Sequence, residues 1–528
     1  MRRIIKLQKL DQNGVSLVLV LTFIVIAGII SGAALTAVLD NLDVSSNIVK
    51  RDQALNIAEA GINYYLWHLS HNSSDYKDGN TTPTTPDPTL GYGPYKHNYI
   101  DSNANTTGTY TLWINPQGGG SSVIDVRSIG QINGSEITRT IDAKIGIPSF
   151  ASYAVNSDSA LWFGNTETAD GPVHSNTGIR LDGSSTATVS SSNTTYVPSG
   201  SLGGDGQSHP GVWCNSSVTT PVNCNTRDKS SWQYPVTSVD FNQVSSSLCS
   251  MKKTAFAANS STSSLATQSN ACSQTPSTLT NTYLPQRSGS YSSTQGYLIE
   301  LNSNGTYNLY KVNGENDQNR PYTSALSLQS VATNISIDSS GVIFAEDNVW
   351  VRTNPNFHGR VSIGAGRLVG SNNATINIVD NLLYSTKSGA DTIGLVAQGD
   401  VLIAPYAPPA SGSFNYEVDA AIISESGNVE YPVAYKTNNN KCTWGWTNNN
   451  QNFNFYGSIS TRLDWTWTWL IGSACGNSVY NASQNAYISG ILNNTTSYDY
   501  NLQYSPPPNF PLTSGYNILS WREVLTIP

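Results

Sequence analysis

The chain has 528 residues, of which 38% are hydrophobic, 10% are aromatic and only 12% are charged, and its formal net charge is −8 at pH 7. Nucleic-acid-binding proteins gather Lys and Arg into patches, and no basic run exists here outside residues 1–14, so the composition excludes a nucleic-acid partner. The 43 glycines and 28 tyrosines, with abundant Ser, Thr and Asn, predict a β-rich extracellular protein built from several parts.

The first predicted element is an apolar helix from Val15 to Leu39, which contains no charged side chain. At about 1.5 Å of rise per residue it is roughly 38 Å long, enough to cross a hydrocarbon core of about 30 Å. Charged residues of opposite sign flank it, Arg2, Arg3, Lys6 and Lys9 before it and Asp40 and Asp43 after it. The positive-inside bias therefore predicts a single pass through the cytoplasmic membrane, with the N-terminus inside and the bulk of the protein outside.

The residues at the start of this run indicate how it is processed. A secretory signal peptide has a shorter apolar region, of about 7 to 15 residues, and is cut beyond it. The sequence Gln12-Asn13-Gly14-Val15 resembles instead a prepilin cleavage site, with Gly14 as the last leader residue and Val15 as the mature N-terminus. Over residues 1–70 the chain is similar to type IV pilins and their minor and pseudopilin relatives. This resemblance implies prepilin peptidase and other pilin subunits as partners.

The fifth residue after the predicted cut is Leu19, where major pilins usually have a glutamate that meets the terminal amine of a neighbouring subunit. A buried carboxylate is costly unless it is paired, so a subunit with no neighbour above it can omit the acid. The resemblance therefore narrows to minor pilins that cap or initiate a pilus. The alternative is an ordinary single-pass anchor.

Beyond the membrane the helix is expected to continue from Asn47 to Leu69, because apolar residues recur there on one helical face. Within it, Ala58-Glu59-Ala60-Gly61 is similar to a motif of minor pilin-type proteins, in which this half of the helix packs on its own head domain. The alternative for these four residues is an amphipathic helix covering a sheet, with the small side chains permitting close packing. The predicted boundaries are 1–14 for the leader and 15–70 for the helix.

Residues 71–149 are predicted to form a connector followed by a small sheet. The stretch 72–108 is rich in Pro, Thr, Asn and Gly and predicts turns. Alternating runs at 109–114, 123–129 and 139–145 predict three antiparallel strands. With the helix they would make a small pilin-like α+β unit.

From Phe150 short apolar strands alternate with Gly, Asn and Asp turns, and Ile343, Val361, Ile378 and Val396 lie 18, 17 and 18 residues apart. A period near twenty residues predicts a parallel β-helix whose coils stack these residues. Its predicted start is 150–199 and its continuation is 291–500. The phrase from Gly171 to Asn176 resembles one in exported pilus-assembly proteins.

Residues 200–290 interrupt this pattern and predict a Ser/Thr/Asn-rich insertion of loops on one face of the β-helix. Sequence proximity predicts three disulfides, Cys214–Cys224 and Cys249–Cys272 in the insertion and Cys442–Cys475 beyond it, among fifteen possible connectivities. No pair has the CxxC spacing of a zinc site, so no metal is expected.

Residues 501–528 are predicted to be a C-terminal tail. The stretch from Tyr504 to Pro511, with Trp521 beyond it, resembles the ending of many β-helical proteins that have a pilin-like N-terminus. Proline removes a backbone donor and Trp521 offers apolar cover, which predicts a cap over the open end of the stacked sheet.

Catalytic signals are weak. The acids of the β-helical region are scattered, and neither His174 nor His358 has an acid or nucleophile beside it in sequence. No GxSxG, HExxH, P-loop or dinucleotide fingerprint is present, so the chain is predicted not to be an enzyme and to need no cofactor. The oxygen-rich run from Asn313 to Asn319 lacks the order of a calcium loop and predicts a solvated turn.

The strongest ligand signal is Trp465, Trp467 and Trp469, which alternate along one predicted strand. An exposed ladder of indoles stacks on sugar rings, whereas buried tryptophans would serve as core. The sequence thus predicts a mainly β cell-surface minor pilin of a type IV pilus or pseudopilus, whose β-helical head serves adhesion or assembly. The alternative is a membrane-anchored β-helical protein that binds or processes carbohydrate.

Overall fold

The computed structural model describes residues 12–72, 75–81, 85–116, 123–217, 223–287, 291–316, 319–407, 413–432, 451–471, 478–481 and 486–524. The chain divides into two compact units. The first is Met1–Asn115, Asp125–Lys144 and Ser520–Pro528, and the second is Pro116–Ile124 and Ile145–Leu519. The prediction of a mainly β protein with a long N-terminal helix is confirmed.

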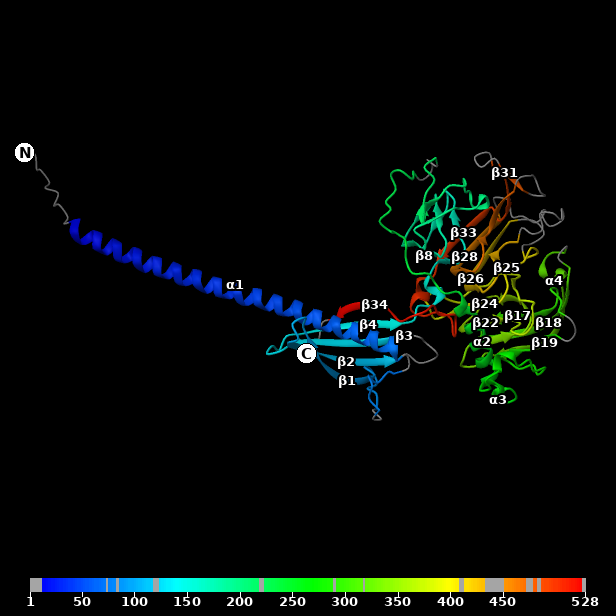
Figure 1. The fold of residues 1–528 in the computed structure, drawn as a ribbon, viewed down its shortest axis with the longest axis horizontal. Helices are drawn as coiled ribbons and strands as arrows, with labels where there is room; N and C mark the ends of the chain where they lie inside the picture. The colour runs from blue at the N-terminus through cyan, green and yellow to red at the C-terminus, as the bar shows by residue number, and fades with distance from the viewer. Residues whose placement is uncertain are drawn as a thin grey trace, which may run out of the picture. The chain divides into compact units, whose positions relative to one another are not determined.

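A single long helix, α1 (Gln12–His71), dominates the first unit (Figure 1). It contains no proline, and the side chains of residues 16–49 are all exposed. The hydroxyl of Thr22 donates to the Leu19 carbonyl at 2.8 Å, and that of Thr36 donates to the Ala33 carbonyl at 2.9 Å, so both are satisfied within the helix. In the described part of the chain, α1 is the one helix long and apolar enough to cross a membrane.

The second half of α1 packs on a five-stranded sheet of order β1-β2-β3-β4-β34. The strands are β1 (Tyr92–Ile100), β2 (Thr106–Pro116), β3 (Val123–Ile132), β4 (Thr138–Gly146) and β34 (Asn517–Val524). Strands β2, β3 and β4 lie where the three alternating runs predicted strands. The turn-rich stretch 72–108 also contains β1, which pairs antiparallel with β2 and which the sequence analysis missed.

The helix face predicted to need a partner is the face that contacts this sheet. Ala54, Ile57, Ala58, Ile62 and Tyr65 are each at most 3% exposed. Close approach depends on glycine, because a Cβ at Gly130 of β3 would lie 2.1 Å from the Ala54 carbonyl oxygen of the helix. Hydrophobic burial along this face therefore joins α1 and the sheet into one unit.

Two large sheets form most of the second unit. The first sheet has parallel pairing throughout its eleven strands. They are β5 (Val155–Ser157), β8 (Val173–Ser175), β11 (Val189–Ser191), β15 (Trp232–Gln233), β16 (Tyr283–Leu284), β20 (Val342–Ala345), β22 (Arg360–Ala365), β24 (Thr392–Ala397), β26 (Phe414–Ser424), β28 (Gln451–Thr461) and β33 (Asn493–Tyr498).

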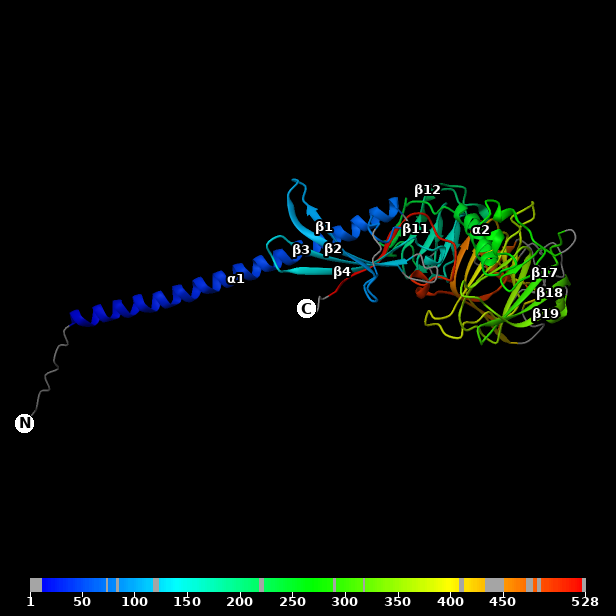
Figure 2. The ribbon, with the colours of Figure 1, turned by 90° about the horizontal axis from the view of Figure 1, so that it is seen from below.

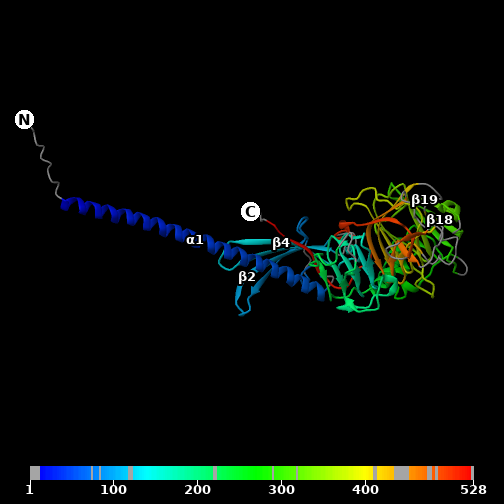
Figure 3. The ribbon, with the colours of Figure 1, turned by 90° about the horizontal axis from the view of Figure 1, so that it is seen from above.

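The second sheet has eight strands, and at one end β17, β18 and β19 pair in antiparallel fashion; β18 and β19 are labelled in Figure 3. Its strands are β17 (Gly296–Asn302), β18 (Thr306–Glu315), β19 (Leu326–Ser336), β21 (Asn348–Asn354), β23 (Ile376–Ile378), β25 (Val401–Ile403), β27 (Val429–Glu430) and β29 (Trp465–Thr466). From β20 to β29, consecutive strands alternate between the two sheets. The main apolar core contains side chains from both of them.

Smaller elements complete the second unit. The short strands are β6 (Leu161–Phe163), β7 (Thr168–Ala169), β9 (Ile179–Leu181), β10 (Ser184–Ser185), β12 (Thr195–Tyr196), β13 (His209–Pro210), β14 (Val212–Trp213), β30 (Thr468–Ile471), β31 (Val479–Asn481) and β32 (Ala486–Gly490). The helices are α2 (Asn242–Ala257), α3 (Ser263–Ala266) and α4 (Tyr322–Ala325), with 3-10 turns η1 (Phe150–Ser152), η2 (Gly200–Leu202), η3 (Ala271–Ser273) and η4 (Tyr500–Gln503).

The predicted repeat of 17 to 18 residues is wrong. Ile378 lies in β23 of the second sheet, whereas the other three residues of that series lie in the first sheet. The true stack in the first sheet is Ile343, Ile363, Leu395, Ile422 and Ile459, with successive separations of 20, 32, 27 and 37 residues. Apolar residues recur in every strand of both sheets, so the nearest similar residue along the chain belongs to the opposite sheet.

The order of strands in space also differs from the order in the chain. Val155 of β5 pairs with Ile459 of β28, so the segment 150–199 stacks on the last long strand of the first sheet. The segment from β16 onward begins at the other end of that sheet, where β16 pairs with β20. The two predicted β-helical segments are therefore joined through β5 and β28, not through the insertion that links them in sequence.

The insertion contains a helix with one buried face, where only loops were expected. Helix α2 lies along the outside of the strands (Figure 2). Its residues Val244, Leu248, Met251 and Phe256 are fully buried and belong to one core cluster with Phe344 of β20. The apolar spacing of this face is helical, but it is short and diluted by serines. Both predicted disulfides of the insertion, Cys214–Cys224 and Cys249–Cys272, are present, while Cys442 and Cys475 lie outside the described residues.

The tail does not cap the end of the stack. Pro507 and Pro508 lie against the face of the first sheet, because a Cβ at Gly394 or Gly341 would come within 2.8 Å of them. Phe510 is 3% exposed and joins the core cluster around α2, whereas Trp521 is 52% exposed in β34. Gly341 and Gly394 have no Cβ, and this gives Pro508 and Pro507 the room to pack there.

Candidate functional sites

The first candidate site is the exposed half of α1. Leu19 is 52% exposed there, in a segment whose side chains make no contact that buries them. Gly14 and Val15 lie in the first turns of the helix, at positions whose exposure the structure does not describe. Up to Leu39 this half of the helix offers a largely apolar surface, which water does not solvate well.

The motif Ala58-Glu59-Ala60-Gly61 lies in the other half, on the sheet. Ala58 and Gly61 are buried, and Glu59 and Ala60 are half-buried. A Cβ at Gly61 would lie 2.3 Å from the Ser128 hydroxyl oxygen and 2.9 Å from the Tyr110 ring. These two small residues therefore permit close helix–sheet packing inside the unit, the alternative that the sequence left open.

The predicted ladder of three exposed indoles does not form. Trp467 is 3% exposed and packs against the rings of Phe453 and Phe455, with centroids 5.1 and 5.9 Å away. Trp465 is half-buried against Phe163, and the Trp469 indole donates to the Tyr431 carbonyl at 2.9 Å. Trp465 and Trp467 have ring centroids 6.2 Å apart and pack on the same apolar core, so burial of the largest apolar rings prevails over an exposed ladder.

A second candidate site is a polar pocket of about 400 Å³ on the first sheet. It lies where β26 and β28 extend beyond β24 and where β33 pairs with β28. The polar residues that line it are Asn415, Asn452, Asn454, Asn493, Asn494 and Thr495. No residue lining it in the described part of the chain is charged.

Strand register builds this pocket. Asn415, Asn452 and Asn493 lie opposite one another on three adjacent strands, and the Asn452 amide donates to the Asn415 side-chain oxygen at 2.8 Å. Two residues further along, Asn454 lies opposite Thr495. The intervening Tyr416 and Phe453 face the core, because side chains alternate along a strand. The sequence analysis missed this site, whose signal is the Asn-Phe-Asn alternation at 452–454 and the polar run Asn-Asn-Thr at 493–495.

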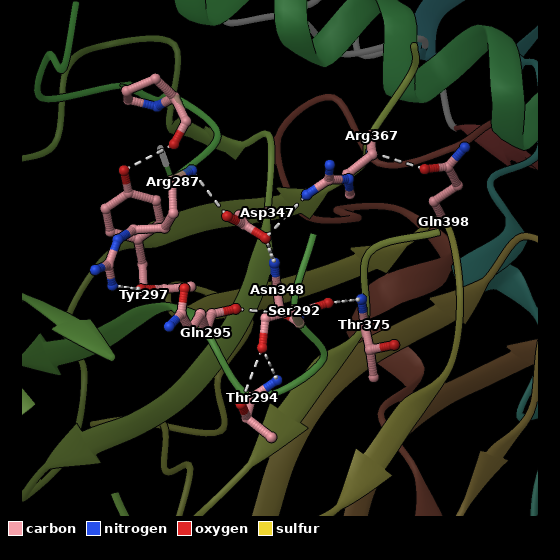
Figure 4. A network of polar contacts seen from close by, with 12 residues as sticks. Arg287, Ser292, Thr294, Gln295, Tyr297, Asp347, Asn348, Arg367, Thr375 and Gln398 are labelled. Carbon is pink, nitrogen blue, oxygen red and sulfur yellow. Dashed lines mark hydrogen bonds and ion pairs between the residues drawn. The ribbon is translucent and has the colours of Figure 1, made fainter. Parts of the chain in front are cut away.

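A buried polar network joins Arg287 and residues 292–295 to Asp347 and Asn348, at the start of β21 (Figure 4). Asp347, 2% exposed, accepts from the Arg287 backbone N–H at 2.9 Å and pairs with Arg367 at 3.4 Å. Asn348 donates to the carbonyls of Ser292 and Gln295, each at 3.1 Å. The carboxylate of Asp347 and the amide of Asn348 both have protein partners, so this network positions the chain.

The structure supplies partners for the two histidines that the sequence analysis weighed as catalytic residues. His358 is exposed and lies 2.9 Å from Asp391, which also accepts from the Gly359 and Thr386 backbone N–H groups at 2.8 Å each. His174 is 1% exposed between Ser190 and Asn176, and burial lowers its pKa. No hydroxyl among the described residues contacts the second ring nitrogen of His358, so the pair lacks a nucleophile.

Three ligand-type atoms, from Asp182, Cys214 and Cys224, lie within 4.8 Å of one another. The two cysteines are joined in a disulfide, so they offer no thiolate. Asp182 accepts from the Trp162 indole at 3.0 Å and pairs with Arg180 at 2.7 Å. The carboxylate is thus used within the protein.

Glu430 of β27 has an unusual environment. It is 8% exposed, and burial, with the nearby carboxylates of Asp400 and Asp464, raises its pKa to about 8. In the unfolded chain a glutamate has a pKa of about 4.3, so the folded state binds more protons between these values. Stability therefore falls as pH rises from about 4.3 to about 8.

The variant Glu430→Gln has the shape of the protonated glutamate but cannot titrate, so it removes the pH dependence of stability that Glu430 causes. We expect it to match the parent protein near pH 4 and to exceed its free energy of unfolding by a few kcal/mol above pH 8. Urea unfolding of both proteins at several pH values measures the difference. A difference that does not grow with pH would contradict the assignment.

No protein-family model matches the sequence, and no curated protein matches it. Among solved structures, the chain is similar to one described as the crystal structure of competence-associated pilin ComZ from Thermus thermophilus. The two chains are 12% identical, the match covers 90% of this chain and 97% of that chain, and the TM-score is 0.29. An identity and a TM-score this low do not assign a function, so the function has to be inferred from the residues of the chain itself.

Proposed function

We propose that the protein is a membrane-anchored, pilin-like subunit that displays a large β-helical head outside the cell. The observation that supports this is the division of α1 into two halves. Residues 16–49 are exposed, and those up to Leu39 are uncharged, whereas one face of the half that follows is buried on a sheet of its own unit. The exposed half suits a membrane, and later a filament in which neighbouring helices cover it.

The head is proposed to be a parallel β-helix. Consecutive strands from β20 to β29 alternate between two parallel sheets, and their inward side chains form one core. Each such circuit contributes one strand to each sheet, which is how a β-helix is built. The width of this head hinders dense packing of neighbouring subunits. Leu19 also stands where major pilins have a glutamate. We therefore place the subunit at a filament tip, as a minor pilin.

Processing at Gly14 tests the proposal. Prepilin peptidase is expected to release residues 1–14, so mass spectrometry of the mature protein should find Val15 at its N-terminus. Gly14→Leu should abolish the cut, whereas Gly28→Leu, a glycine inside the apolar helix with open space around it, should not.

Two outcomes count against the proposal. A mature N-terminus beyond Leu39 would indicate an ordinary signal peptide and would remove the pilin-like helix. Immunogold labelling that is dense and regular along a filament shaft would contradict a place at the tip, and label confined to the envelope would favour a plain anchored protein.

A second candidate function is carbohydrate binding by the anchored head, and the polar pocket favours it. The head is proposed to have no catalytic role, since the His358–Asp391 pair lacks a nucleophile among the described residues.

A further inference from the structure

We propose that the polar pocket formed by β26, β28 and β33 binds a neutral carbohydrate. This inference rests on the proposed display function and deepens it by naming the class of ligand. The pocket has the size of a small-molecule site, about 400 Å³, and lies on regular strands that hold its side chains in register.

The chemistry of the lining selects the ligand. An asparagine amide offers both donors and an acceptor, and Thr495 adds a hydroxyl that can do either. Sugar hydroxyls also donate and accept, so this lining satisfies them. An anionic ligand would need a cation, and the residues that line the pocket in the described ranges include none. An apolar ligand would leave the amides without hydrogen-bond partners, which is costly.

The spacing of the amides suits an extended ligand, in which several sugar units follow one another. Adjacent strands are about 4.8 Å apart, and residues two apart along a strand are about 6.6 Å apart. Asn415, Asn452 and Asn493 form one row across the strands, and Asn454 with Thr495 forms the next. Hydroxyls on neighbouring sugar units would thus reach successive rows.

The second row of the pocket is exposed, whereas other amides are used within the protein. Asn452 donates to Asn415, and Asn494 donates to the Thr468 hydroxyl and the Ile491 carbonyl. Asn454 is exposed, and Thr495 opposite it is also exposed. Because Asn454 and Thr495 are exposed, substitutions in the second row give the test.

The experiment uses the full chain, purified in a detergent without a sugar headgroup, on an array of neutral and of sialylated or sulfated oligosaccharides. We expect neutral oligosaccharides to bind. The double variant Asn452→Leu/Asn454→Leu should bind at least about tenfold more weakly, as expected when one or two hydrogen bonds are lost. Asn372→Leu, at an exposed asparagine between β22 and β23, is the matched control and should bind like the parent.

Thermal unfolding of each protein shows whether it is folded, and Asn454→Leu alone serves if the double variant is not. No binding of neutral oligosaccharides, binding of acidic ones only, or unchanged binding in the folded variants would overturn the proposal. The N-terminal sequence and membrane fractionation of the same preparation test the display function separately, so an anchored protein that binds no sugar would refute the pocket alone.

Discussion

Lys252→Met is expected to lower the free energy of unfolding by about 3 to 5 kcal/mol, because it removes one partner of a buried ion pair. Lys252 of α2 is fully buried and Glu346, its partner after β20, is 2% exposed. Burial lowers the pKa of Lys252 and raises that of Glu346, so each group depends on the other to stay charged. Denaturant unfolding of the full chain measures the loss.

Two further variants make this result specific. Lys252→Met/Glu346→Gln removes both charges and should recover most of the stability, because a buried pair replaced by neutral groups costs little. Lys253→Met, at the next and only half-buried position of α2, should change the stability little. A single variant as stable as the parent would mean that the pair does not hold α2 on the sheet.

Gly130→Val is expected to separate the second half of α1 from its sheet, at a cost of at least about 3 kcal/mol. The new Cβ would lie 2.1 Å from the Ala54 carbonyl oxygen and 2.5 Å from the Ala58 nitrogen. Both are backbone atoms of the helix, so no rotamer change relieves the clash. The helix would have to move away and expose Ile57, Ile62 and Tyr65.

Limited proteolysis detects this change, as faster cleavage between residues 50 and 70. The control is Gly314→Val in β18, where a Cβ has open space and no positive φ restricts the backbone. Equal protease resistance of the parent and Gly130→Val would show that the close approach of helix and strand is not required.

Patterns within one element were predictable from the sequence. The length and apolar content of α1, the buried face from Ala54 to Tyr65 and the strands β2, β3 and β4 all follow from periodicity, which depends only on neighbours along the chain. Both described disulfides join cysteines close in sequence, so proximity was enough. Helix α2 escaped prediction because serines interrupt the apolar spacing of its buried face.

Pairings between distant segments were not predictable, and the candidate sites depend on them. Ile343, Ile363 and Leu395 stack although 20 and 32 residues separate them, since turns of unequal length leave no constant period.

The sequence by itself determined the apolar first half of α1, its amphipathic second half and the β character of the second unit, because local side-chain spacing encodes these. Only the tertiary structure decided that β5 pairs with β28, that Trp467 is core and that Asn415, Asn452 and Asn493 share one row. These depend on which strands pair, and that choice is made by burial of the whole core rather than by any one segment.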